Sequence, residues 1–271
     1  MCKYCIALQN PSGSRALGEK GKFWPVGETL GIQFIGGTEE QKSLVQYHAQ
    51  TWTYYANIDF KWDVDKGEIR VAFNDGDGAW SYIGTDCKSI PLSRPTMNLG
   101  WLDQSVILHE FGHALGLGHE HQNPEGGIQW NVDQVIKDLS GAPNYWDIST
   151  IMFNVIEPYR ADQIVGTKLD PFSIMMYAFP KEWTLNGFET DWNEELSDQD
   201  KDFIGSVYPF EQEPADDVLE AFRTVFQGKS DLKKLNEGVI CRIGDLIGAG
   251  TDEHRYWKRE NLEKVWQKLI G

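Results

Sequence analysis

Apolar positions near the start of the chain follow first the spacing of a strand and then that of a helix. Residues 29–35 have the strand pattern, and after two glycines residues 39–56 have the helix pattern. Along that helix four residues recur at intervals of three and four, which predicts one packed face: Leu44, His48, Trp52 and Tyr55. His48 is therefore expected to be a packing residue.

The pattern then returns to short strands. Residues 59–62, 68–73 and 79–85 are separated by turns of Asp, Gly and Asn, and residues 96–101 give another predicted strand. Asp103 caps a second predicted helix, whose apolar residues are Val106, Ile107, Leu108, Phe111, Ala114 and Leu115. This order of strands and helices is typical of an α+β or α/β fold.

The second half of the chain has a different character. Residues 126–195 are rich in Pro, Gly, Asn and Trp, which predicts long packed loops, and Ser197 opens a helix that stops before Pro209. Helical spacing dominates after residue 214. We therefore predict an N-terminal segment at 1–28, a main domain at 29–211 and a small helical appendage at 214–271.

Two hypotheses stay open for the appendage. In the first, its helices pack on the main domain and stabilise it, because about 55 residues are marginal as an independent fold. In the second, residues 214–271 form a targeting or adaptor module that binds a partner.

Composition and charge narrow the possible partners. The 271 residues include eleven tryptophans and are 41% hydrophobic, which is typical of a folded protein. A formal net charge of −16 repels nucleic acid and anionic membranes, so neither is expected as a partner. No apolar run approaches the roughly 18 residues of a membrane span, and residues 1–10 lack a secretory signal. We expect a cytoplasmic protein, or one exported by a leaderless or specialised route.

One short segment carries the clearest chemistry. His109 and His113 lie four residues apart on a predicted helix, so both imidazoles can reach one Zn²⁺ ion at about 2.0–2.1 Å. Gly116 can end the helix in the left-handed conformation and return His119 to the same ion as a third ligand. Three histidines leave a fourth position for water, which is typical of a catalytic zinc site.

Glu110 is the expected general base. It lies beside the first ligand, where it can take a proton from a zinc-bound water whose pKa the metal lowers towards about 7. The same carboxylate would then pass the proton to the leaving amine. The motif therefore predicts one catalytic zinc ion and hydrolysis of peptide bonds.

Two motifs together carry a family resemblance. The run HEFGHALGLGH at residues 109–119 and the later SIMMY at 173–177 resemble the zinc motif and methionine turn of the metzincin peptidases. Glu120 and the form of the turn are similar to the astacin branch, and further matches at residues 29–209 are similar to the compact astacin-like enzymes of bacteria and fungi. The resemblance implies an α+β metzincin-type domain with a twisted, mainly parallel sheet, an active-site helix and a loop-rich lower subdomain.

The resemblance also implies roles for single residues. Met175 would form an apolar floor under the three histidines. Tyr177 would be a further zinc ligand at rest that swings out to stabilise the oxyanion of the tetrahedral intermediate. The strand at residues 79–85 would be the sheet edge along which a peptide substrate lies antiparallel.

The chain departs from animal astacins after His119. The arginine and acidic residues that follow this histidine in animal astacins are absent here. In mature astacins the glutamate at this point pairs with a new N-terminus left by propeptide removal, and no latency motif or obvious activation site precedes Trp24. The role of Glu120 therefore stays open. His121 lies outside the pattern and is not expected to bind the metal.

Four cysteines are too few and too scattered for a disulfide scaffold, so a reducing compartment is permitted: Cys2, Cys5, Cys87 and Cys241. Cys2 and Cys5 form a CxxC pair with several possible roles. Inert thiols, a disulfide, a redox pair, a second metal and a latency ligand that blocks the catalytic zinc all stay open.

The leading hypothesis is a zinc-dependent endopeptidase that acts on protein or peptide substrates. An alternative is a catalytically silent zinc-containing module that binds a peptide or a partner, although Glu110 and Tyr177 both favour catalysis. Zinc hydrolysis of a non-peptide amide is chemically allowed, but the resemblance does not favour it.

Overall fold

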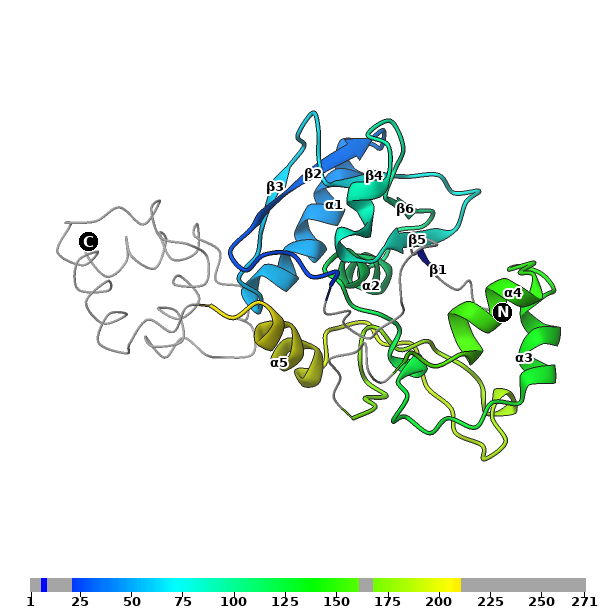
Figure 1. Cartoon of the computed structure of the whole chain (residues 1–271). Coiled ribbons are helices and arrows are strands. Elements are labelled where there is room, and N and C mark those ends of the chain that lie inside the picture. The colour runs from blue at the N-terminus through cyan, green and yellow to red at the C-terminus, as the bar shows by residue number, and fades with distance from the viewer. Residues whose placement is uncertain (1–5, 9–20, 161–167, 211–271) are drawn as a thin grey trace, which may run out of the picture.

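A six-stranded sheet forms the upper half of the molecule (Figure 1). The computed structural model describes residues 6–8, 21–160 and 168–210. The strands are β1 (Ile6–Leu8), β2 (Thr29–Ile35), β3 (Asp59–Trp62), β4 (Ile69–Ala72), β5 (Ala79–Tyr82) and β6 (Met97–Leu99). Their order is β1-β5-β6-β4-β2-β3, and every neighbouring pair is parallel except β5 and β6.

Helices cover the sheet and build the lower half. The α-helices are α1 (Glu39–Ala49), α2 (Gln104–Ala114), α3 (Val132–Leu139), α4 (Ile148–Ile151) and α5 (Asp198–Val207). A π-helix, η4 (Met152–Ile156), extends α4, and four 3₁₀ helices are η1 (Gln50–Tyr54), η2 (Gly84–Ser89), η3 (Glu120–Gln122) and η5 (Lys181–Trp183). Figure 1 shows α2 between the sheet and the green to yellow segments that follow it.

The upper and lower halves of the molecule each have a hydrophobic core. The first contains the inner residues of the sheet, α1 and α2, together with Ile174 and Met175. The second contains residues of α3, α4 and η4, together with Met176 and Tyr177. The chain thus passes from one core to the other between Met175 and Met176.

Strand β1 lies at the edge where a substrate strand was expected. It pairs in parallel with β5, with Ile6 opposite Trp80 and Leu8 opposite Tyr82. The other edge of β5 pairs with β6. A segment of the chain itself therefore occupies the free edge of β5.

The predicted fold class is confirmed, but several predicted elements differ in detail. The strand expected at 79–85, for example, ends at Tyr82 and is followed by η2. The helix expected at 39–56 ends at Ala49 and continues as the 3₁₀ helix η1. Its buried face consists of Val45, Ala49 and Trp52, whereas Leu44 is 37% exposed. The region expected to be loops contains α3, which is anchored by the buried Val135 and Leu139. Among the described residues no helix is long and apolar enough to cross a membrane.

Several predictions fall outside the described part of the chain. They concern the appendage at 214–271 and the cysteines Cys2, Cys5 and Cys241. Cys87 is described as a buried free thiol, and its burial raises its pKa to about 12. The domain boundaries stay predictions.

Candidate zinc site

Helix α2 places the site at the boundary between the two cores. The Asp103 carboxylate caps its start by accepting a hydrogen bond from the backbone N–H of Val106 at 2.9 Å. The helix is buried along its length from Ser105 to Ala114. The helix ends at Ala114, and Gly116 just beyond it has the expected positive φ, 101°, which is strained for residues with a Cβ. A Cβ at this position would also lie 2.7 Å from the Phe23 ring.

Each of the three histidines uses Nδ1 to bond an oxygen atom of the protein. His109 Nδ1 lies 2.8 Å from the carbonyl of Ile174, and His113 Nδ1 lies 2.8 Å from the carbonyl of Leu117. His119 Nδ1 lies 3.4 Å from Gln122 Oε1. Because a carbonyl oxygen only accepts, Nδ1 carries the proton in each ring and Nε2 keeps its lone pair.

The three rings bring nitrogen atoms together as a zinc site requires. One ligand nitrogen from each of His109, His113 and His119 lies within 4.8 Å of the others. The Nε2 atoms of His113 and His119 are 3.2 Å apart, close to the about 3.3 Å expected between two nitrogens bound to a tetrahedral zinc ion. The Nε2 atom of His109 is buried and has no hydrogen-bond partner among the described residues. These donors fit a zinc ion.

Burial keeps the three imidazoles neutral. It lowers the pKa of His109 to about 4 and holds the pKa values of His113 and His119 well below the usual value. A neutral imidazole is the form that binds a metal. The three rings therefore need not lose a proton, and carry no positive charge that would repel a metal cation.

The predicted catalytic residues lie beside this cluster. Glu110 is completely buried on α2, next to His109. The Tyr177 ring is 3% exposed, and its centroid lies 4.3 Å from that of His119 and 6.1 Å from that of His109. The structure therefore brings Glu110, Tyr177 and the three histidines to one place.

The methionine turn packs directly against α2. Met175 is 2% exposed, and a Cβ on Gly112 would come within 2.5 Å of its sulfur. Glycine at position 112 is therefore what allows Met175 to approach the helix. The carbonyl of Met175 also accepts a hydrogen bond from the backbone N–H of Glu120 at 2.9 Å, which joins the turn to the residue after the third histidine.

The structure gives the Glu120 carboxylate two hydrogen-bond partners. Its Oε1 accepts hydrogen bonds from the Asn123 amide at 3.2 Å and from the backbone N–H of Asp170 at 3.0 Å. Burial raises the pKa of this carboxyl group to about 7. Within the part of the chain that the structure describes, Asn123 and the backbone of Asp170 therefore bond the Glu120 carboxylate.

His121 lies outside the three-histidine group. Its ring packs on Tyr177, with centroids 4.4 Å apart, and its Nε2 lies 2.9 Å from the carbonyl of Asn154 in η4. Burial lowers its pKa to about 3. The His121 ring therefore packs between Tyr177 and the backbone of η4.

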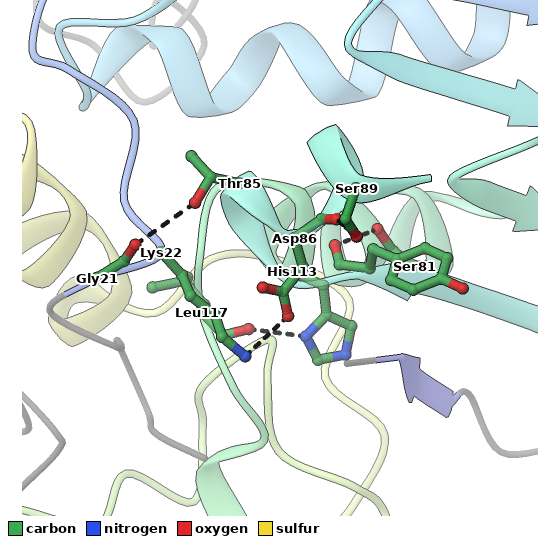
Figure 2. Close-up of polar contacts among 9 residues, drawn as sticks. Gly21, Lys22, Ser81, Thr85, Asp86, Ser89, His113 and Leu117 are labelled. Atoms are coloured by element: carbon green, nitrogen blue, oxygen red, sulfur yellow. Dashed lines mark hydrogen bonds and ion pairs between the residues drawn. The ribbon is translucent and has the colours of Figure 1, made fainter. Parts of the chain in front are cut away.

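A buried ion pair lies near the end of α2. Lys22 Nζ lies 2.8 Å from the Asp86 carboxylate in η2, and both side chains are largely buried. Figure 2 shows this pair beside the hydrogen bond between His113 and Leu117. The backbones also approach closely, because a Cβ on Gly84 would collide with the Lys22 carbonyl and lie 3.2 Å from the Cα of Gly116.

Three residues that sequence reasoning did not identify complete the surroundings of the site. Asp200 holds the methionine turn, Gln122 contacts His119, and Trp192 lines a recess beside His109. The only local signal concerned Asp200, because a Ser followed three residues later by an acidic residue is a helix-capping pattern. The contacts of Asp200 and Trp192 in the site are with residues distant in the sequence.

Comparison with known proteins agrees with this geometry. The chain is similar to the zinc metalloproteinase nas-30 of Caenorhabditis elegans, with 27% identity over 88% of this chain and 32% of that protein. It is also similar to astacin-like metalloprotease toxin 5 of Loxosceles gaucho, with 24% identity over 48% of this chain and 76% of the toxin. The chain thus spans only about a third of the length of the nematode protein.

A solved structure extends the agreement to the fold. Myroilysin has 38% sequence identity and a TM-score of 0.69, over 72% of this chain and 98% of that chain. Residues 18–190, more than half of the sequence, match the model of the astacin peptidase family. These findings confirm the predicted fold and the predicted single zinc ion. The chain belongs to the astacin family of zinc metallopeptidases.

Proposed function

We propose that this chain is a zinc-dependent endopeptidase that cleaves peptide bonds in protein substrates. The observation that carries the proposal is the buried convergence of His109, His113 and His119 beside Glu110 and Tyr177. Family membership and the zinc metalloproteinases among the relatives support the same assignment.

The residues divide the chemistry between them. The three histidines would hold a zinc ion, which supplies Lewis acidity to the substrate carbonyl and to a water molecule. Glu110 accepts the proton of the attacking water and passes it to the leaving amine. The Tyr177 hydroxyl donates a hydrogen bond to the oxyanion that develops on the substrate carbonyl. The buried surroundings strengthen these interactions by excluding bulk water.

The decisive experiment uses the full chain and a library of peptides. We expect chelator-sensitive cleavage, and a loss of about 10²–10⁴-fold in kcat/KM for Glu110→Gln, because this change removes the general base and keeps the side-chain shape. Zinc content measured on the same variant should remain near one ion per chain. If wild-type protein with bound zinc cleaves no peptide, the silent-module alternative replaces this proposal.

The partners and the location are part of the proposal. Protein or peptide substrates follow from the family, and an adaptor or targeting partner for residues 214–271 stays a hypothesis. Deletion of 214–271 tests it: retained activity with changed localisation supports an adaptor, whereas loss of folded protein supports packing for stability. We propose a cytoplasmic location or a leaderless or specialised export route, which cell fractionation would test.

A further inference from the structure

A recess beside the histidine cluster is lined partly by residues that the proposed mechanism does not use. His109 and Tyr177 line this recess together with Val106, Ile174, Met176 and Trp192. Because two of the lining residues belong to the reaction centre, a substrate side chain that enters the recess belongs to a residue next to the scissile bond.

The chemistry of the lining favours an uncharged side chain. Ser105 and Asn193 complete the recess, and none of the eight lining residues is an acid, a lysine or an arginine. The side chains that line the recess therefore offer a charged substrate side chain no opposite charge to replace the hydration that it would lose. An aliphatic or small polar side chain meets no such penalty.

Trp192 is fixed in place by the first turn of α2. Its indole Nε1 donates a hydrogen bond to Ser105 Oγ at 2.6 Å, and Ser105 Oγ donates to the Asp103 carboxylate at 2.5 Å. Asp103 is itself the cap of α2. The amide of Gln104 adds a bond to the carbonyl of Glu194 at 2.9 Å. The loop that carries the tryptophan is therefore attached to the same helix that carries His109.

The next residue fixes the loop from the other side. Asn193 Nδ2 donates to the carbonyls of Pro171 and Ser173 at 2.9 Å and 2.8 Å, so the loop is also tied to the start of the methionine turn. The loop is thus held at both ends of this segment, and the indole cannot turn aside without breaking its hydrogen bond to Ser105. Its bulk therefore limits the size of a side chain that can enter.

We propose that Trp192 is a specificity-determining residue, and that it restricts the position beside the scissile bond to small or medium uncharged side chains. This inference rests on the proposed peptidase function. It predicts a selectivity in both size and charge that follows from the recess and not from the zinc chemistry.

The test compares kcat/KM for peptides that differ only at one position next to the cleaved bond. We expect wild type to prefer Ala or Val over Phe, Asp and Lys. Trp192→Ala should improve the ratio of Phe to Ala about tenfold or more, since each group accommodated in a pocket changes discrimination by roughly that factor. Trp192→Phe keeps a large ring and should retain most of the size discrimination, and all three proteins should continue to reject Asp and Lys.

A binding measurement separates this inference from the proposed function. The same peptides are titrated into the Glu110→Gln variant, with and without Trp192→Ala, by calorimetry. Size-dependent binding that relaxes in the double variant, together with no cleavage by wild type, would support the recess and reject the peptidase. An unchanged ratio of Phe to Ala in both cleavage and binding would overturn the role of Trp192.

Discussion

The Asp200 carboxylate on α5 accepts a hydrogen bond from the Ser173 hydroxyl at 2.6 Å, at the start of the methionine turn. Its other oxygen accepts from the backbone N–H of Ile174 at 2.7 Å. The carbonyl of Ile174 in turn bonds Nδ1 of His109. A helix that follows the site by many residues therefore helps to orient the first metal ligand.

Asp200→Asn should lower the free energy of unfolding by about 1–3 kcal/mol, because an amide cannot accept all the bonds that the buried carboxylate accepts. It should also weaken zinc binding through His109. Urea unfolding and chelator competition measure the two effects. Asp198→Asn is the matched control, since the Asp198 side chain is 98% exposed on the same helix. Equal stability of the two variants would contradict this role of Asp200.

Gln122 should matter for the third ligand in a similar way. Its Oε1 faces His119 Nδ1, while its amide donates to the carbonyls of Phe153 and Glu157 at 2.6 Å and 2.8 Å. Gln122→Leu removes all three bonds and should weaken zinc affinity about 10–100-fold, as measured by competition with a chelator of known affinity.

Two further variants make the Gln122 result specific. Gln122→Glu keeps an acceptor for His119 Nδ1 and should lose less affinity than the leucine variant. Gln134→Leu removes a glutamine whose bond to Asp138 lies within α3, and should bind zinc as wild type does. If Gln122→Leu also binds zinc as tightly as wild type, Gln122 does not position His119.

The ion pair between Lys22 and Asp86 should contribute to stability because of its burial. Lys22→Met leaves the Asp86 carboxylate buried without its opposite charge, and should lower the free energy of unfolding by about 3–5 kcal/mol. Lys42→Met is the comparison, since its partner Glu39 is 84% exposed, and should cost less than about 1 kcal/mol. Denaturant unfolding measures the free energy of unfolding of both variants. A similar decrease in the two would mean that burial does not determine how much the Lys22 pair contributes to stability.

Elements specified by local patterns could be predicted from the sequence, as β2, β3 and the cap of α2 show. The strand pattern at 29–35 has the bounds of β2, and Asp103 caps α2 as its position before the helix indicated. The helix expected at 39–56 ended early at a 3₁₀ segment in which Trp52 Nε1 donates to the carbonyl of Leu108. That contact spans 56 residues, so no local spacing reveals it.

In the site too, some residues could be predicted from local sequence spacing and others depend on contacts between distant residues. The three histidines and Glu110 follow one another on or just after a helix, so their meeting could be inferred from helical geometry. The bond between Trp192 and Ser105 joins residues 87 apart, and the bond between Asp200 and Ser173 joins residues 27 apart. Such contacts depend on the tertiary fold, which is why the residues that position the site were missed.

Strand β1 gives a prediction about access to the site. A peptide that adds itself to the sheet as a strand needs the free edge of β5, and β1 occupies that edge. Replacing β1 by glycine, with Ile6→Gly, Ala7→Gly and Leu8→Gly together, lowers its tendency to form a strand. This variant should cleave long peptides with a kcat/KM several-fold above wild type in the first minutes of the reaction.

Ala7→Val should have the opposite effect on β1, because it raises the tendency of this segment to form a strand. A β-branched residue favours the strand, so this variant should be slower than wild type on long peptides. Both variants should bind zinc equally, because β1 holds none of the three histidines. Zinc content measured alongside the rates separates a change in edge competition from damage to the site. If the glycine variant and Ala7→Val cleave long peptides at the same rate, β1 does not compete with substrate for the edge of β5.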